Sequence, residues 1–292
     1  SPATRSSEVC LMAMAWQVHP HLPLVLAANR DEFHDRAARP MAWWEGRDIL
    51  AGQDLQAGGT WLGLSRQGRI GVLTNVREPG AQQAGLPSRG ALVPLWLKGG
   101  AVGDPSPLQA LRTEPSEQEM SQHLQAWPTN GYNLLGLDLV KAQAHCWSNR
   151  HGHRHHLEPG VYGLSNAALD TPWPKLQRLK QRLAQACSQA AGPGDPLTAL
   201  LIEALADREP VADEHLPQTG VPLEWERWLS RIFIETPDAR YGTRCSTVIV
   251  VRRPSAQHWQ VHVVEQGWNP QGQPSSRVEQ SWTLSLPPTA GA

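Results

Sequence analysis

The sequence predicts an α+β protein in which two mainly antiparallel sheets pack together and helices cover the outside. Three observations support this prediction: apolar strand-like runs fill the first half of the chain, a block with helical periodicity follows, and strand-like runs return near the end. Several of these runs are apolar at successive positions, which is typical of strands buried on both faces. No internal repeat or linker divides the chain, so we expect one domain over 10–286 after an N-terminal extension, 1–9.

The first predicted element is a hairpin that brings a cysteine next to charged side chains. One strand is the apolar run Cys10–Trp16, and the other ends at Asn29-Arg30-Asp31-Glu32. The segment between them, His19–Pro23, contains two prolines and cannot continue a strand. A turn at the first of these prolines would set Cys10 opposite Arg30. A neighbouring guanidinium lowers the pKa of a cysteine from its free value of about 8.5 and stabilises the reactive thiolate.

The remaining elements follow in the order that the fold class requires. A second hairpin is predicted from Trp61–Leu64 and Ile70–Asn75, and a surface loop over 77–90, which is rich in Gly, Pro, Ser and Gln. The helical spacing and the apolar runs predict the other elements. These are helix Ala91–Lys98 ending at Gly99-Gly100, strands Tyr132–Leu139 and Ala144–Trp147, helices Lys175–Gln189, Pro196–Ala206 and Leu223–Ile234, and strands Thr243–Val251 and Trp259–Glu265.

Composition and charge exclude several classes of function. The formal net charge of the 292 residues is −1, so the chain has no long-range field for a polyanion, and we expect neither nucleic acid nor a membrane surface as partner. No apolar run is long enough to span a membrane, and the polar start 1–8 does not resemble a signal peptide. We therefore expect a cytoplasmic protein with a small-molecule substrate or ligand, whose oligomeric state stays open. The four cysteines are far apart without a CxxC pair, which indicates neither a metal site nor a disulfide framework.

Motifs spread along the chain resemble one known family. In order, they are Cys10, Asn29-Arg30-Asp31-Glu32-Phe33, Gly58-Gly59-Thr60-Trp61-Leu62-Gly63, Leu73-Thr74-Asn75, Ser88-Arg89-Gly90, Tyr162-Gly163-Leu164-Ser165-Asn166 and Tyr241-Gly242-Thr243-Arg244. Together they resemble the NRDE family, also called the TANGO2 (transport and Golgi organization 2) family, from Cys10 to about Val264. Its members look like N-terminal nucleophile (Ntn) hydrolases. The resemblance therefore implies a four-layer αββα sandwich related to penicillin V acylase and bile salt hydrolase.

The resemblance also implies a set of catalytic residues. Those acylases carry an N-terminal cysteine, an arginine and an aspartate on the next strand, two asparagines and a distal arginine. Carried over residue by residue, these fall on Cys10, Arg30, Asp31, Asn75, Asn166 and Arg244. The acylases space their arginine and aspartate three apart, whereas here the two adjoin, and neighbours on a strand point to opposite faces. Arg30 or Asp31, and not necessarily both, therefore reaches the thiol.

Each of these residues has a specific chemical role in the mechanism that the resemblance implies. The α-amine of an N-terminal cysteine, whose ordinary pKa is about 7.7 to 8.0, accepts the thiol proton and later protonates the leaving amine. Asp31 would orient that ammonium, and Arg30 would favour the thiolate. The side-chain amide of Asn75 or Asn166 would donate to the oxyanion, an interaction worth roughly 3 to 4 kcal/mol. Arg244 would complete the charge network. We assign substrate contacts to Asn29, Glu32 and Trp61.

One feature conflicts with this mechanism. Eight residues and Val9 precede Cys10, so that its nitrogen is an amide and cannot act as a base. We expect Val9 to be a misread valine-type start codon, which would give a product that begins Met-Cys and loses the methionine. A propeptide cut between Val9 and Cys10 is the rival explanation. A genuine extension on a non-catalytic protein is the third.

Simpler explanations stand beside several of these assignments. A cysteine in an apolar strand is usually a small buried hydrophobe, and Asn29–Glu32 could form a solvated strand end. Asparagines such as Asn75 and Asn166 commonly satisfy backbone groups in turns. Arg244 beside Cys245 invites a second thiolate hypothesis, but the residues after Cys245 predict a buried strand.

Two other clusters are assigned no catalytic role. The histidines 151, 153, 155 and 156 lie between predicted strands without cysteine or carboxylate spacing, so a solvated loop is favoured over a metal site. The 13 tryptophans are explained mainly by core packing; an apolar pocket near Trp43, Trp44 and Trp61 is a weaker inference.

Two functional classes stay open. The first is an Ntn-type hydrolase that cleaves a linear, non-peptide carbon–nitrogen bond and needs no cofactor. The second is a haem or lipid binding or trafficking protein, because members of the family have been linked to haem trafficking and lipid homeostasis. A haem carrier needs an axial ligand in an apolar pocket, and the sequence has no fixed-spacing haem motif.

Overall fold

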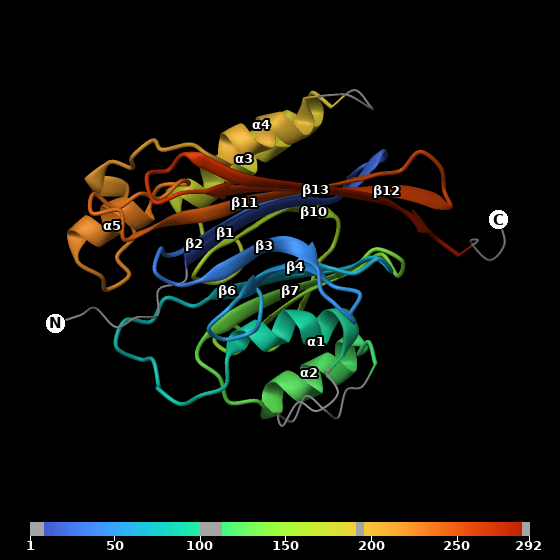
Figure 1. Ribbon diagram of the computed structural model, residues 1–292, viewed down its shortest axis with the longest axis horizontal. Coiled ribbons are helices and arrows are strands. Elements are labelled where there is room, and N and C mark those ends of the chain that lie inside the picture. The colour runs from blue at the N-terminus through green and yellow to red at the C-terminus, as the bar shows by residue number, and fades with distance from the viewer. Residues whose placement is uncertain (1–8, 100–112, 191–195, 288–292) are drawn as a thin grey trace. The chain divides into compact units, whose positions relative to one another are not determined.

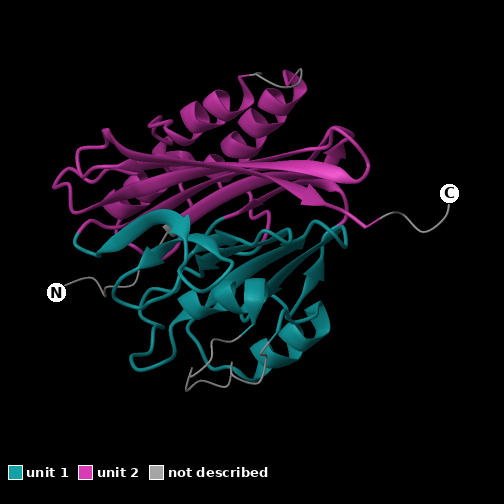
Figure 2. Ribbon diagram, turned by 45° about the vertical axis from the view of Figure 1, so that its right-hand side comes forward, with its two compact units in different colours: residues 1–9, 35–157, 165–168 teal, residues 10–34, 158–164, 169–292 magenta. Residues whose placement is uncertain are grey.

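The structure is a computed structural model that describes residues 9–99, 113–190 and 196–287. The chain forms two compact units that interleave along the sequence (Figure 2). Unit 1 comprises Ser1–Val9, Asp35–Leu157 and Ser165–Ala168, and unit 2 comprises Cys10–His34, Glu158–Leu164 and Leu169–Ala292. Because the chain passes between the units several times, neither unit is a contiguous half of the sequence.

Unit 2 is built on an antiparallel sheet with the strand order β10-β1-β2-β11-β12-β13. Strands β1 and β2 form the predicted hairpin, joined at Pro20-His21. The strands are β1 (Val9–His19), β2 (Leu22–Phe33), β10 (Gly160–Leu164), β11 (Tyr241–Arg252), β12 (His258–Trp268) and β13 (Pro274–Ser285). The helices are α3 (Pro174–Ser188), α4 (Leu197–Leu205) and α5 (Leu223–Leu229), with a 3₁₀ turn, η3, at Asp213–His215.

Helices α3 and α4 cover one face of this sheet (Figure 1). The odd-numbered residues 11, 13 and 15 of β1 and 25 and 27 of β2 pack in the same core as leucines from both helices, including Leu179, Leu183 and Leu201. Side chains on a strand alternate between its two faces. The even-numbered residues of these stretches, Cys10 and Arg30 among them, therefore lie on the face away from α3 and α4.

Unit 1 is built on a second antiparallel sheet with the order β3-β4-β5-β6-β7-β8-β9. Its strands are β3 (Ala38–Trp43), β4 (Leu50–Asp54), β5 (Leu62–Leu64), β6 (Arg69–Asn75), β7 (Tyr132–Asp138), β8 (Gln143–Ser148) and β9 (His155–His156). Helices α1 (Leu92–Lys98) and α2 (Glu117–Ala126) pack on one face, and the 3₁₀ turn η1 (Arg89–Ala91) leads into α1. Their core contains Trp96, Leu124, Leu134 and Trp147.

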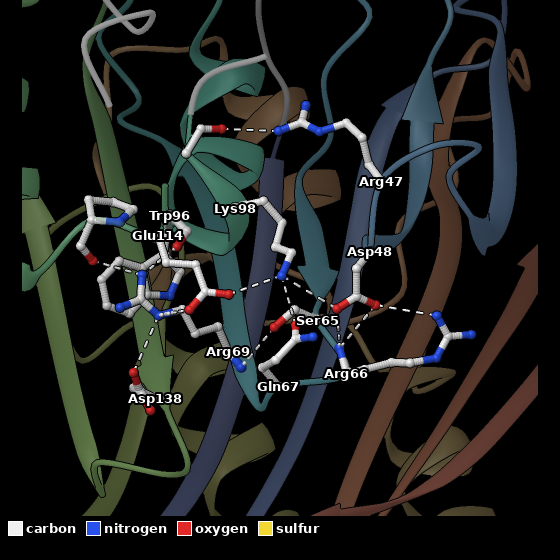
Figure 3. Close-up of polar contacts among 12 residues, drawn as sticks. Arg47, Asp48, Ser65, Arg66, Gln67, Arg69, Trp96, Lys98, Glu114 and Asp138 are labelled. Carbon is white, nitrogen blue, oxygen red and sulfur yellow. Dashed lines mark hydrogen bonds and ion pairs between the residues drawn. The ribbon is translucent and has the colours of Figure 1, made fainter. Parts of the chain in front are cut away.

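A buried arginine ties α1 to the strands beneath it. Arg69, at the start of β6, donates to the Asp138 carboxylate at 3.3 Å and to the Trp96 carbonyl at 2.9 Å (Figure 3). Its guanidinium lies 4.2 Å from the centre of the Trp96 ring. Arg69 also donates to the Pro115 carbonyl at 2.7 Å, so its buried guanidinium links α1, the segment before α2 and β7.

The predicted fold class is confirmed: the protein is α+β with two antiparallel sheets, and the described residues contain five α-helices. The predicted helix Leu223–Ile234 is too long, since α5 ends at Leu229. Beyond it, the backbone N–H of Phe233 donates to the Asp207 carbonyl, and that of Ile234 to the Thr243 hydroxyl, so these groups leave the helical pattern. Gly100, named as part of a helix end, lies outside the described residues. Within the described ranges, we find no helix that could cross a membrane.

Candidate active site

Cys10 begins the well-packed part of β1. Its side chain is 7% exposed, and the next residue, Leu11, is fully buried in the core beneath α3 and α4. Alternation along the strand directs the thiol to the opposite face of the sheet. Residues paired across two antiparallel strands share a face of the sheet. Cys10 and Arg30 both lie on the face away from α3 and α4, which agrees with their predicted pairing.

A second cysteine, Cys245, lies beside Arg30. The two are directly paired in the β2–β11 ladder and both are buried. The pKa of the Cys245 thiol is affected by charged or ionisable neighbours that include Cys10, Arg30 and Arg244. Burial raises the pKa of Cys245 well above its ordinary value, and the Glu265 carboxylate raises it further, although Arg30 and Arg244 act in the other direction. Cys245 is therefore a protonated thiol at neutral pH.

The position of Arg244 follows from a β-bulge. In the ladder, Thr243 pairs with Asp31 but Cys245 pairs with Arg30, so Arg244 is the extra residue. A bulge re-aims side chains locally. Here the Arg244 Nη1 donates to the Phe33 carbonyl at 2.7 Å, which fixes the guanidinium near the end of β2.

Two polar residues of β2, Asp31 and Asn29, form hydrogen bonds on the face of the sheet away from Cys10. The Asp31 Oδ1 accepts from the Thr243 hydroxyl at 2.6 Å. The Asn29 Nδ2 donates to the carbonyls of Leu205 and Ile232, at 2.8 and 3.0 Å, and its Oδ1 accepts from Ser246. Leu205 is the last residue of α4, so Asn29 points to the helix-covered face. Alternation then places Arg30 and Cys10 on one face, and Asn29 and Asp31 on the other.

Glu32 shares the face of Arg30 because it lies two residues further along β2. The Arg30 Nη2 is 3.9 Å from the Glu32 Oε2, and both side chains are buried. The other oxygen of Glu32 accepts from the Phe33 backbone N–H at 2.7 Å. The carboxylate therefore orients the guanidinium and partly neutralises it.

The two candidate asparagines lie together in unit 1. Asn75 ends β6, and Asn166 follows β10. The Asn166 Nδ2 donates to the Asn75 backbone carbonyl at 2.7 Å, and the Ser165 hydroxyl donates to the Asn166 Oδ1. The Asn166 carbonyl in turn accepts from the Arg77 N–H at 2.8 Å. Both asparagines are buried, and these bonds fix the orientation of the Asn166 amide.

Trp61, also in unit 1, packs against a glycine. A methyl group added at Gly52 of β4 would lie only 2.5 Å from the Trp61 ring, so the glycine leaves the space that the indole fills. The described histidines, cysteines and acidic residues contain no group of three that could hold a metal ion. Of the four histidines predicted to lie in a solvated loop, His151 and His153 do so, whereas His155 and His156 form the short strand β9, and none of the four belongs to such a group.

Glu265 acts on the charge of Cys245 and Thr243 bonds to Asp31, and neither was predicted as a site residue. Glu265 is 3% exposed on β12, opposite Thr247, and affects the charge of Cys245. The available signal was a single carboxylate that follows the apolar run Val261–Val264. Its partners depend on the β11–β12 register, which the sequence alone does not reveal.

The described residues thus define an α+β protein with two antiparallel sheets that buries a cysteine near two arginines. The chain belongs to the Transport and Golgi organisation 2 family, whose model matches residues 9–270. A mouse protein named Transport and Golgi organization 2 homolog is 36% identical over 242 residues, which cover 78% of this chain and 82% of the relative. The human homolog is 34% identical over 244 residues, with the same coverage of each chain. Transport and Golgi organization protein 2 of Drosophila melanogaster is 24% identical over 265 residues, covering 86% and 89%.

Two solved structures have low similarity to this one. A Caenorhabditis elegans ortholog of N-acylethanolamine-hydrolyzing acid amidase aligns with a TM-score of 0.41 and 11% identity, covering 82% of this chain and 92% of that one. A mutant conjugated bile acid hydrolase from Clostridium perfringens aligns with a TM-score of 0.36 and 9% identity, covering 96% and 99%. Similarity at this level carries no statement about the chemistry of the chain.

Proposed function

We propose that the protein is a cysteine amidohydrolase of the N-terminal-nucleophile type, which cleaves a linear, non-peptide amide of a small molecule. The observation that carries the proposal is the cluster in unit 2. Cys10 and Arg30 lie on one face of the sheet, and Arg244 is held near them by the bulge in β11. Guanidinium groups favour a thiolate over a thiol, and the thiolate is the nucleophilic form.

The two cysteines of this cluster have different roles in the proposal. Burial and Glu265 keep Cys245 protonated, so it is not the nucleophile. Cys10 is the one whose own nitrogen can serve as a base, provided that it is the first residue of the working protein.

The reaction would proceed in two halves. In the first, the α-amine of Cys10 takes the thiol proton, and sulfur bonds to the carbonyl carbon of the amide. The C–N bond then breaks as the α-ammonium protonates the leaving nitrogen, which leaves a thioester on Cys10. In the second half, water gives a proton to the α-amine and attacks the thioester. The acid is released, and the thiol is restored.

The oxyanion of each tetrahedral intermediate needs a fixed hydrogen-bond donor. The proposal assigns this role to the side-chain amide of Asn166 or Asn75. Two facts support Asn166. Its amide is oriented by the bond to the Asn75 carbonyl. In addition, Asn166 comes only two residues after the end of β10, the strand that pairs with β1.

The proposal gives supporting roles to the other predicted site residues. Asp31 lies on the face away from the Cys10 thiol, so its proposed partner is the backbone ammonium of Cys10, while its bond to Thr243 fixes β2 against β11. Glu32 positions Arg30, and Trp61 offers an apolar surface to the substrate. Asn29 is the weakest candidate for a substrate contact, because its amide is already bonded to two backbone carbonyls.

Turnover by a chain that begins at Cys10 tests the proposal. We would offer it N-acyl amides of small amines and follow amine release, with Cys10→Ala as the inactive variant and Cys245→Ala as the matched control. We expect turnover by the parent chain and by Cys245→Ala, slower turnover by Cys10→Ser, and none by Cys10→Ala. No turnover in any form, together with tight haem uptake followed by absorbance, would instead support the carrier alternative.

A further inference from the structure

Two histidines in unit 1 face each other across neighbouring strands. His145 on β8 is paired directly with His156 on β9. Residues in direct antiparallel register share a face of the sheet, so both imidazoles point to the same side. Their ring centres are 5.1 Å apart, and the ring planes are inclined by 55°.

His145 is an unusual buried histidine. Its side chain is 4% exposed, yet within the described residues neither ring nitrogen has a hydrogen-bond partner. Buried polar groups are nearly always bonded, and an unsatisfied one in a native structure needs an explanation. The ring packs against Trp147, with centres 5.6 Å apart.

A shared metal ion would explain why the two rings face each other, and it would provide a partner for one of the two His145 nitrogens. Imidazole nitrogens bind Zn²⁺ at about 2.0–2.1 Å, so two imidazoles on one ion at a tetrahedral or square angle have ring centres about 5 Å apart. The observed spacing matches this geometry. We propose that His145 and His156 form a two-histidine site for a divalent transition-metal ion of the Zn²⁺, Cu²⁺ or Ni²⁺ class, with water completing the coordination.

The charges around the pair are compatible with a bound cation. Burial lowers the pKa of His145 to about 4, and the charges of Arg154 and His156 add to this effect. His145 is therefore neutral at pH 7, as a metal ligand must be. Arg154 is exposed, so solvent screens its repulsion of a cation. Glu117, at the start of α2, contributes the opposite charge.

The neighbouring residue on β9 provides a matched control. His155 precedes His156 on the two-residue strand and pairs with Cys146, so it points to the other face. Its Nε2 contacts the His151 carbonyl at 3.1 Å. Both β9 histidines are exposed, so replacing either one should leave the fold intact.

The test measures binding of Zn²⁺ and Ni²⁺ to the full chain at pH 7.5 by calorimetry, and the Cu²⁺ spectrum by electron paramagnetic resonance at one equivalent. We expect one ion per chain in the parent protein and in His155→Ala, with copper coupled to two imidazole nitrogens. His156→Ala should weaken binding at least tenfold and leave one coupled nitrogen. His145→Gln should do the same, provided that its circular dichroism matches the parent.

Equal affinity of His155→Ala and His156→Ala, or no ion bound by the parent chain, would overturn the proposal. The same holds if His155→Ala is the more damaging of the two changes, because the ions would then be held by the exposed loop histidines instead.

Discussion

Cys245 on β11 is paired directly with Arg30 on β2, and Cys10 lies near enough to act on the charge of the same thiol. The cluster therefore contains two buried cysteines in similar surroundings, of which only one is proposed to react. The raised pKa of Cys245 explains the difference, because it keeps that thiol protonated, and it also makes the difference measurable.

Alkylation should distinguish the two thiols. In a chain that begins at Cys10, iodoacetamide at pH 7.5 should modify Cys10 and leave Cys245 unmodified, because a protonated buried thiol is not nucleophilic. Peptide mass mapping would locate the label. Cys245→Ala should leave the labelling rate unchanged, and faster labelling of Cys245 than of Cys10 would contradict the assignment.

Thr243→Val should destabilise the fold. The Thr243 hydroxyl donates to Asp31 and accepts from the Ile234 N–H, and all three groups are buried. Replacing the hydroxyl with a methyl removes both hydrogen bonds and leaves the buried Ile234 N–H without this acceptor, at a cost of about 1–3 kcal/mol. Urea unfolding would measure the loss. Thr283→Val, an exposed position on β13, is the control and should change the free energy of unfolding by less than about 0.5 kcal/mol.

Asn29→Ala should affect stability more than substrate binding. The change removes two bonds to backbone carbonyls and one from Ser246, which should cost about 2–4 kcal/mol in total. In the folded fraction, KM should stay close to that of the parent chain. Gln257→Ala, in the exposed β11–β12 turn, is the stability control. A large rise in KM without loss of stability would restore Asn29 as a substrate contact.

Acid should destabilise the protein partly through the half-buried His34 and the buried His145. Burial lowers the pKa of both His34 and His145 to about 4, whereas an unfolded histidine titrates near 6.5. Between these pH values the unfolded state binds protons that the folded state does not bind. The free energy of unfolding therefore falls as pH drops from about 6.5 towards 4. His145→Gln should flatten this dependence in urea unfolding between pH 7 and 4.5. His258→Gln, an exposed position, should leave the dependence unchanged.

The hairpin at the site could be predicted because local signals agree there. Prolines mark the turn between two apolar runs, and the packing of alternate residues of β1 and β2 against α3 and α4 fixes the side of each residue. Alternation also resolves which β2 residue shares the cysteine's face: it is Arg30, while Asp31 bonds to Thr243. The bulge at Arg244 could not be predicted, since it depends on the pairing of strands more than 200 residues apart in sequence.

Other elements carried weaker signals. Strand β13 is polar and exposed over most of its length, so its alternating apolar signal is limited to Val278, Trp282 and Leu284, and it forms by pairing with β12. Helix α2 begins with a capping box between Ser116 and Glu119, a local signal that was present in the sequence but not used. The unsatisfied nitrogens of His145 could be recognised only from its packing.

The most direct test of the central claim is the mass of Cys10 after exposure to a thiol-directed acyl probe, compared between the chain that begins at Cys10 and the 292-residue chain. Only the first has the α-amine that can accept the thiol proton, so we expect rapid acylation there, with a midpoint near about pH 7 to 8. In the 292-residue chain, acylation of Cys10 should be far slower at every pH. Equal rates of acylation and amide turnover in the two forms would contradict the N-terminal-nucleophile mechanism.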